Sequence, residues 1–253
     1  MRDAPALLLV GTADTKAEEL AYLRRTAEAP GARVALMDVG VLRTPPYAPE
    51  IGNAEVAAAA GTTLAALAAL GDENAAMAAM ACGAAAIARD RHARRELDGL
   101  IALGGTMGTD LALDVAAALP LGVPKVIVTT VASSHLIPPE RLAPDLMMVL
   151  WAGGLYGLND VCRATLSQAA GAVVGACRAV QPPRAGRPRV AITSLGKSCL
   201  AYMVRLAPAL ASRGYEPVVF HSTGMGGRAL EALLDQGQFA AVFDCCQAEL
   251  ANW

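Results

Sequence analysis

The stretch Leu100–Thr109, which reads Leu-Ile-Ala-Leu-Gly-Gly-Thr-Met-Gly-Thr, decides the fold class of this chain. Its first four residues are apolar and are followed by glycine, a pattern typical of a strand buried inside a parallel sheet. The helix behind the turn is expected to be capped by Thr109 or Asp110. The glycines predict a tight turn with φ above zero, at Gly104, Gly105 and Gly108.

A strand, a glycine-rich turn and a helix in this order aim free backbone N–H groups and a helix N-terminus at an anion. The sequence therefore predicts a phosphate-binding turn made by Gly104, Gly105, Thr106, Gly108 and Thr109. The alternative is a tight turn that joins the strand to the helix and binds nothing. A glycine-rich turn alone does not decide between the two.

The same element recurs at residues 11–15, 194–198 and 221–227. Apolar runs alternate with helical segments along the chain, which predicts an α/β protein with parallel sheets and helices on both faces. In an open sheet of this kind the turns lie at the carboxyl edge of the strands, where ligands bind. Together with the end of the strand at 124–129, they supply further candidate ligand contacts: Gly11, Thr12, Asp14, Thr15, Thr130, Ser133, His221, Thr223 and Gly224.

The segment Gln181–Pro188 contains three prolines and is the best candidate for a domain boundary. We expect a first domain at 1–180, with a five-stranded, mainly parallel sheet that carries the predicted phosphate-binding turn, and a second domain of the same α/β class at 188–253.

Two local patterns predict how the helices form. Thr15, with Glu18 three residues on, matches a capping box at the start of the first helix. The alanine-rich stretches Ala54–Ala69 and Asn74–Ala88 predict helices that pack closely, either within a subunit or between subunits.

The composition excludes several classes of protein. Of 253 residues, 55% are apolar and only 4% are aromatic, so the core must be built from Ala, Leu, Val and Met. No uncharged apolar run approaches the ~20 residues of a membrane-spanning helix, and the first residues do not resemble a signal peptide, so we expect a cytoplasmic protein. The net charge of −2 gives no general attraction to nucleic acid or to an anionic membrane.

The metal-ligating residue types are scattered. Six cysteines occur without CxxC spacing, and they are expected to be reduced core residues. None of the three histidines has a partner at the spacing of a metal site, so we predict no structural metal.

Three residues each have more than one interpretation. Asp38 ends the second predicted strand, where an acidic residue commonly binds a ribose hydroxyl, and the alternative is an Asp that caps a helix or stabilises a turn. His221 could contact a ligand, act as a general base or cap its turn. Lys197 follows Gly196 as in a Walker A loop, but Ala191 stands where that loop needs glycine. It is therefore expected to be a solvated turn residue or a single phosphate-facing charge.

Several short motifs in order resemble the ATP-binding domain family named for the tomato mosaic virus resistance protein. They are Gly11-Thr-x-Asp14-Thr15-Lys16, Asp38-Val39-Gly40, Gly104-Gly105-Thr106-x-Gly108-Thr109, Pro124-Lys125-Val126, Thr129-Thr130-Val131-Ala132-Ser133, Gly157-Leu158-Asn159, His221-x-Thr223-Gly224 and Glu249-Leu250-Ala251. The resemblance implies two Rossmann-like domains, ATP as ligand, with or without Mg²⁺, and a homodimer.

The chain departs from that family in places that concern catalysis. Ser134-His135 and Gly154 stand where the family usually has acidic residues, and the chain stops at Trp253, where members continue. The second domain is therefore expected to be incomplete.

Three functions follow as hypotheses. The first is binding of a nucleotide or another phosphorylated small molecule as a binding or regulatory module. The second is a small-molecule enzyme with its site in the cleft between the domains, and the third a non-catalytic dimeric module. Because no complete catalytic set is present, binding is favoured over catalysis.

Overall fold

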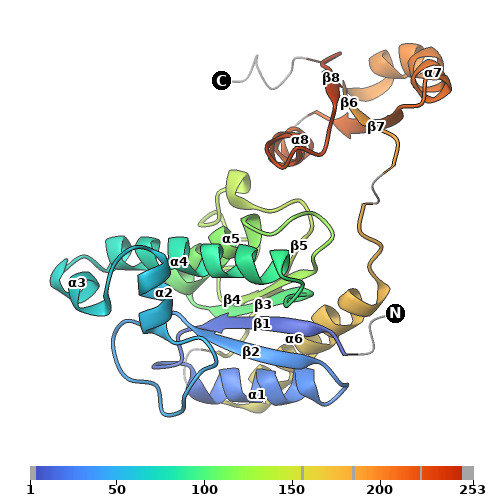
Figure 1. The fold of residues 1–253 in the computed structure, drawn as a ribbon. Coiled ribbons are helices and arrows are strands. Elements are labelled where there is room, and N and C mark those ends of the chain that lie inside the picture. Colours follow the sequence, from blue (N-terminus) through green and yellow to red (C-terminus); the bar gives the residue numbers. More distant parts are fainter. Residues whose placement is uncertain (1–3, 155–156, 184–185, 223, 247–253) are drawn as a thin grey trace. The chain divides into compact units, whose positions relative to one another are not determined.

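The structure is a computed structural model that describes residues 4–154, 157–183, 186–222 and 224–246. The chain divides into two compact units, residues 1–182 and 183–253, and each is described by itself (Figure 1). Both are built from parallel strands and helices, which confirms the predicted α/β class.

The first unit contains a five-stranded sheet in the order β2-β1-β3-β4-β5, and every neighbouring pair is parallel. The central strand β3 is the apolar run that precedes the glycine-rich turn, and all six of its residues are buried. The strands are β1 (Ala6–Gly11), β2 (Arg33–Asp38), β3 (Gly99–Gly104), β4 (Lys125–Thr129) and β5 (Leu146–Leu150).

Helices cover both faces of this sheet because its strands are apolar on both sides. Helices α1 (Ala17–Glu28) and α6 (Asp160–Ala179) lie on one face (Figure 1). On the other face lie α2 (Asn53–Ala59), α4 (Glu73–Ala93) and α5 (Thr106–Ala117). The short α3 (Leu64–Ala69) connects α2 to α4, and a 3-10 turn, η1, spans Pro139–Arg141.

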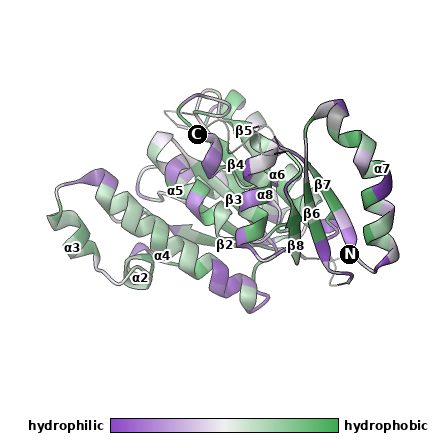
Figure 2. Ribbon diagram, turned by 90° about the horizontal axis from the view of Figure 1, so that it is seen from above, coloured by the Kyte–Doolittle hydropathy of each residue, from purple (hydrophilic) through white to green (hydrophobic). Residues whose placement is uncertain are grey.

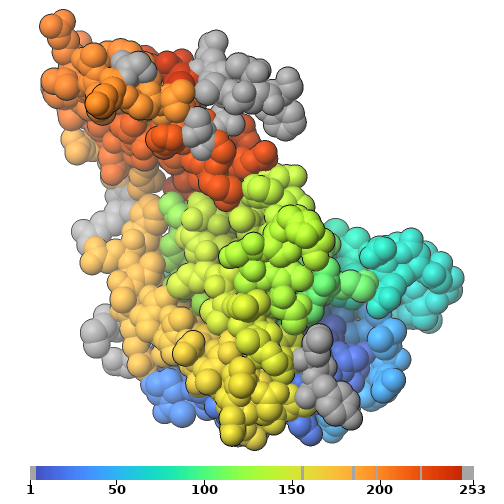
Figure 3. Space-filling model, turned by 180° about the vertical axis from the view of Figure 1, so that it is seen from behind, coloured from blue at the N-terminus to red at the C-terminus, as the bar shows by residue number. Residues whose placement is uncertain are grey.

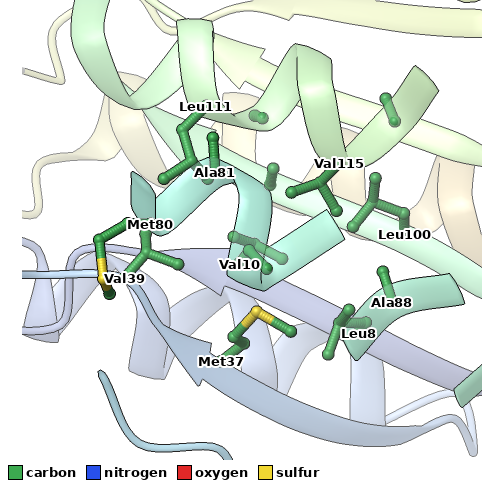
Figure 4. Close-up of a cluster of buried hydrophobic side chains, with 14 of the residues drawn as sticks. Leu8, Val10, Met37, Val39, Met80, Ala81, Ala88, Leu100, Leu111 and Val115 are labelled. Atoms are coloured by element: carbon green, nitrogen blue, oxygen red, sulfur yellow. The ribbon is translucent and has the colours of Figure 1, made fainter. Parts of the chain in front are cut away.

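Alternate side chains of each strand supply the two cores. Leu8 and Val10 of β1 pack with Met80 of α4 and Val115 of α5, as Figure 4 shows. Leu9, between them in sequence, belongs to the core under α1 and α6. In the space-filling view, the part of the chain between β4 and α6, coloured yellow-green to light orange, forms much of the surface of the first unit on the side shown (Figure 3).

The alanine-rich region forms three helices rather than the two that were predicted. Gly61 and Gly71 have φ of +74° and +61°, and they end α2 and α3. Figure 2 shows that α4 is largely apolar with a hydrophilic C-terminal end, where Asp90, Arg91 and His92 lie. Close packing occurs within the unit, because a Cβ on Gly83 of α4 would lie 2.0 Å from the carbonyl oxygen of Val56 in α2. A homodimer stays a prediction.

The second unit contains a three-stranded parallel sheet in the order β7-β6-β8. Its strands are β6 (Arg189–Ser194), β7 (Glu216–His221) and β8 (Ala241–Phe243), and its helices are α7 (Gly196–Ser212) and α8 (Met225–Asp235). The core cluster of the second unit is small and contains Val190, Ile192, Met203 and Leu210, and further buried apolar side chains among the described residues are Ala191, Cys199, Leu230 and Leu233.

Two expectations from composition can be compared with the structure. No helix in the described ranges has both the length and the apolar composition to cross a membrane. The cysteines are free, and Cys162, Cys177 and Cys199 are buried as expected. Cys82 is exposed and Cys245 and Cys246 are half-buried, so the prediction that these three are core residues is wrong.

We predict that Gly83→Ala destabilises the first unit, because the new methyl group meets the backbone of α2 and forces two helices apart. Overpacking of this kind costs about 1 to 3 kcal/mol. The control is Gly171→Ala in α6, where no atom lies within 4 Å of the new Cβ. Alanine in that open helix position should stabilise the protein by about 0.5 to 1 kcal/mol. Urea unfolding measures both, and equal effects would contradict the close approach of α2 to α4.

Candidate functional site

The order of the strands creates a switch point between β1 and β3. The chain leaves β1 through α1 on one face of the sheet and leaves β3 through α5 on the opposite face (Figure 1). The two connections therefore separate at the carboxyl ends of neighbouring strands. In open α/β sheets ligands bind in the crevice at such a point.

Helix α5 begins at this switch point without a side-chain cap. Its N-cap residue is Gly105, which has no side chain that could accept a hydrogen bond from the helix. The first turn contains no acidic residue. The backbone N–H groups of that turn have no partner within the helix. They and the positive end of the helix dipole suit an anion.

The glycines of this turn have a different role from the one predicted. None of Gly104, Gly105 and Gly108 has a positive φ, so the prediction of a left-handed turn is wrong. Gly104 is needed for a close approach, since a Cβ there would lie 2.5 Å from the carbonyl carbon of Gly108. At Gly105 a Cβ would meet nothing within 4 Å, so the space beside the N-terminus of α5 is open.

Thr109 fixes the first turn of α5 to the neighbouring strand. It is 1% exposed, and its hydroxyl donates to the carbonyl oxygen of Gly105 at 2.7 Å. The same hydroxyl lies 2.6 Å from that of Thr129 at the end of β4. Thr109 and Asp110 therefore lie inside the helix, and the prediction that one of them is its N-cap is wrong.

Helix α1 supplies a second N-terminus at the same edge. The predicted capping box does not form, because the N-cap residue is Lys16 and it makes no side-chain cap bond. The hydroxyl of Thr15 instead lies 2.8 Å from that of Thr12. The two turns are adjacent, since a Cβ on Gly11 would lie 3.3 Å from the carbonyl oxygen of Leu103.

A pocket of about 170 Å³ lies against the start of α5. Thr106 and Asp110 bring polar groups to it, and Asp110 and Asp114 are both paired with Arg141 of η1. The remaining described lining residues come from α4, α5 and the segment that follows β4: Asn74, Met77, Met107, Thr109, Leu113, Val131, Leu136 and Ile137.

The carboxylates of Asp38 and Asp14 accept hydrogen bonds from the backbone of the first unit. Asp38 is fully buried, and its Oδ1 accepts hydrogen bonds from the N–H groups of Ala13 and Gly40, both at 2.9 Å. Asp14 Oδ2 accepts from the N–H groups of residues 42 and 43, both at 3.1 Å. These carboxylates hold the segment after β2, which favours the turn interpretation of Asp38 over a ribose contact.

The second oxygens of these carboxylates lack partners. Asp14 Oδ1 and Asp38 Oδ2 are buried and have no hydrogen bond among the described residues. Burial raises the pKa of Asp38, the N–H groups of Gly40 and Ala13 lower it, and the charge of Asp14 raises it further.

The first unit thus brings together two groups of predicted residues, 11–15 and 104–109. Thr130 and Ser133 follow β4 on the α5 side of the switch point, and Ser133 has a φ of +58°. His221 ends β7, and Gly224 precedes α8 with a φ of +59°, so both belong to the second unit. Thr223 lies outside the described residues. The sequence patterns do not identify Asn74, which lines the pocket, or Arg141, which pairs with Asp110, because only tertiary packing brings them to the start of α5.

The comparisons with known proteins agree on one family. Residues 5–182 match the model of the N-terminal domain of an uncharacterised protein family, UPF0261, and residues 187–253 match that of its C-terminal domain. A UPF0261 protein of Brucella suis biovar 1 is 56% identical over 250 residues, which cover 99% of this chain and 60% of that protein. The chain therefore belongs to the UPF0261 family, and it spans about 60% of the length of such relatives.

Two further similarities are more distant. The ToMV resistance protein Tm-1 of Solanum lycopersicum is 34% identical over 165 residues, 63% of this chain and 22% of that protein. A C2-type ketoreductase from a modular polyketide synthase aligns with 97% of this chain and 56% of its own, at 18% identity and a TM-score of 0.34.

We predict that Asp38→Asn keeps the two backbone bonds through its amide oxygen and removes a buried charge. A carboxyl whose pKa is raised on folding stabilises the folded state at acid pH, and this contribution is lost as the pH rises through the raised pKa. The difference in melting temperature, variant minus parent, should therefore increase as the pH is raised from about 4 to about 7.

The matched variant Asp38→Ala loses both acceptors and should destabilise the protein at every pH by about 2 to 4 kcal/mol. Thermal unfolding followed by circular dichroism at several pH values measures both variants. Equal losses for asparagine and alanine at pH 7 would contradict the account of Asp38.

Proposed function

For this member of a family whose description states no activity, we propose that the first unit binds a nucleotide or another phosphorylated small molecule at the β1–β3 switch point. ATP is the ligand that the sequence resemblance favours. The ligand's phosphates would lie against the first turn of α5, beside Gly105 and Thr106.

The observation that carries this proposal is the pair of helix N-termini, α1 and α5, at one switch point. Neither has a side-chain cap from its N-cap residue. Their first-turn N–H groups need acceptors, which phosphate oxygens provide. The open space at Gly105 leaves room for them.

Two polar side chains near the N-termini of α5 and α1 could contact the phosphates. Thr106 is exposed at the start of α5, and its hydroxyl can donate to a phosphate oxygen. Lys16 brings a positive charge to the start of α1, where its ammonium lies 5.3 Å from the ring centroid of Trp151. Glu18 and Glu19 of α1 oppose an anion at that helix, so the N-terminus of α5 is the stronger phosphate site.

The carboxylates near the site support binding rather than turnover. Phosphoryl transfer needs a metal held by carboxylates and a positioned nucleophile. Asp14 and Asp38 accept backbone hydrogen bonds, and Asp110 is paired with Arg141. These residues do not form a Mg²⁺ site by themselves, so any Mg²⁺ would enter with the nucleotide. Bound nucleotide would then serve as a structural ligand or a regulatory signal.

We expect Gly105→Asp to weaken ATP binding at least tenfold, because its carboxylate occupies the space proposed for phosphate. Gly105→Asn is the matched control, since it has the same shape and no charge. Both residues can cap α5, so both should preserve or raise its stability. Isothermal titration of the full chain with ATP measures the affinities. Equal affinities for the two variants would place the phosphates elsewhere.

Turnover gives a separate prediction. If the first unit is a binding module, phosphate release from ATP should be far slower than an ordinary enzyme rate of ~1 s⁻¹. A coupled phosphate assay with Mg²⁺ and saturating ATP measures this rate. Release at ~1 s⁻¹ or faster would show that the protein is an enzyme.

A further inference from the structure

Three cysteines of the second unit lie at the carboxyl ends of β6 and β8. Cys199 belongs to the first turn of α7, which follows β6, and Cys245 and Cys246 follow β8. As the structure describes them, none of the three forms a disulfide. The proposed function uses none of these thiols.

Helical spacing turns Cys199 toward the sheet. Met203 and Leu210 of α7 pack with apolar side chains of β6 in the core cluster of this unit. Cys199 lies one turn before Met203 and is therefore on the same face of the helix. The residue is only 3% exposed. Its thiol lies between the first turn of α7 and the end of the sheet.

Cys245 reaches the same place from the sheet. It is half-buried and packs against the core cluster to which Met203 and Leu210 belong. The hydroxyl of Tyr202 in α7 lies 2.9 Å from Sγ of Cys199 and 3.3 Å from the carbonyl oxygen of Cys245. One hydroxyl group thus bridges the two cysteines, which makes them neighbours across the contact between α7 and the end of β8.

The sulfur of Cys199 accepts two hydrogen bonds. The N–H of Leu195, the N-cap residue of α7, donates to it at 3.2 Å, and the hydroxyl of Tyr202 donates to it at 2.9 Å. The bond to Cys199 is the largest of the causes that raise the pKa of Tyr202 to about 12, so this hydroxyl keeps its proton at neutral pH. Donors of this kind at a helix N-terminus favour the thiolate form of a cysteine and offset the effect of burial.

Cys245 is the more accessible member of the pair. Burial raises the pKa of its thiol, and the charges of Cys199, Asp244 and Cys246 raise it further. Its thiol is therefore mostly protonated at neutral pH. Cys246 is anchored to the β6 side instead, because its N–H donates to the hydroxyl of Thr193 at 2.9 Å.

We propose that Cys199 and Cys245 are a redox-active dithiol, which a low-molecular-weight disulfide such as glutathione disulfide converts into an intramolecular disulfide. In the first step the thiol of Cys245 loses its proton to solvent, and its sulfur attacks glutathione disulfide and releases one glutathione thiolate. In the second step the thiolate of Cys199 attacks Sγ of Cys245, and the other glutathione leaves as a thiolate. Two protein thiols are oxidised to one disulfide, and glutathione disulfide is reduced to two molecules of glutathione.

The new bond would join β8 to α7. Strand β8 has three residues, all exposed, and it lies at the edge of the sheet, where it pairs with β6. The disulfide would fix the segment that follows this short strand to the first turn of the helix. The site lies entirely in the second unit, so the proposal is independent of nucleotide binding at the β1–β3 switch point.

Disulfide mapping of the full chain tests the proposal. The reduced protein is incubated with glutathione disulfide, remaining thiols are alkylated, and the protein is digested with trypsin without reduction. Cleavage after Lys197, Arg205 and Arg228 places Cys199 in the peptide 198–205 and the other two cysteines in the peptide 229–253. We expect mass spectrometry to find these peptides joined, with fragmentation assigning the bond to Cys245. An alkylated peptide 198–205, with stable glutathione adducts or a bond between Cys245 and Cys246 as the products, would overturn the proposal.

Variants identify the partner of Cys199. Cys245→Ala should lower the yield of joined peptides at least tenfold. Cys246→Ala is the matched control, because it removes the adjacent thiol, and it should change the yield less than twofold. Cys199→Ala should leave glutathione attached to Cys245, since the second step is then blocked. Circular dichroism melts verify that each variant is folded. Equal yields for the Cys245→Ala and Cys246→Ala variants would contradict the assigned pair.

Discussion

Burial of both faces of one parallel sheet is the constraint on which the rest of the first unit depends. Its strands are apolar on both sides, so each alternate side chain needs a cover of helices. The chain meets this need by placing α1 and α6 on one face and α2, α4 and α5 on the other. The connections therefore change face between β1 and β3. The candidate site is thus a consequence of how the core is covered.

Close backbone contacts then shape that site. Gly104 lets the end of β3 approach the first turn of α5, and the hydroxyls of Thr109 and Thr129 join that turn to β4. Asp38 and Asp14 hold the segment after β2 in a similar way. Many of the polar residues here serve the geometry of the turns. The groups left for a ligand are mainly backbone N–H groups and exposed side chains such as Thr106.

Sequence patterns predict much of this architecture because strands and helices depend on local composition. The apolar run at 100–103 predicts β3, and the proline-rich segment at 181–188 separates the two units of the structure. Details that depend on contacts distant in sequence could not be predicted. Thr109 is a good N-cap residue by type, but its bond to Thr129 fits a position inside the helix. Asn74 lines the pocket and Arg141 pairs with Asp110, and both placements arise only from packing of distant segments.

The central claim is that two helix N-termini at the β1–β3 switch point form a phosphate site. A crystal structure of the full chain with a non-hydrolysable ATP analogue tests it most directly. The account predicts phosphate oxygens within about 3 Å of the backbone nitrogens in the first turn of α5. A nucleotide bound elsewhere, or bound with its phosphates in solvent away from Thr106 and Met107, would contradict it.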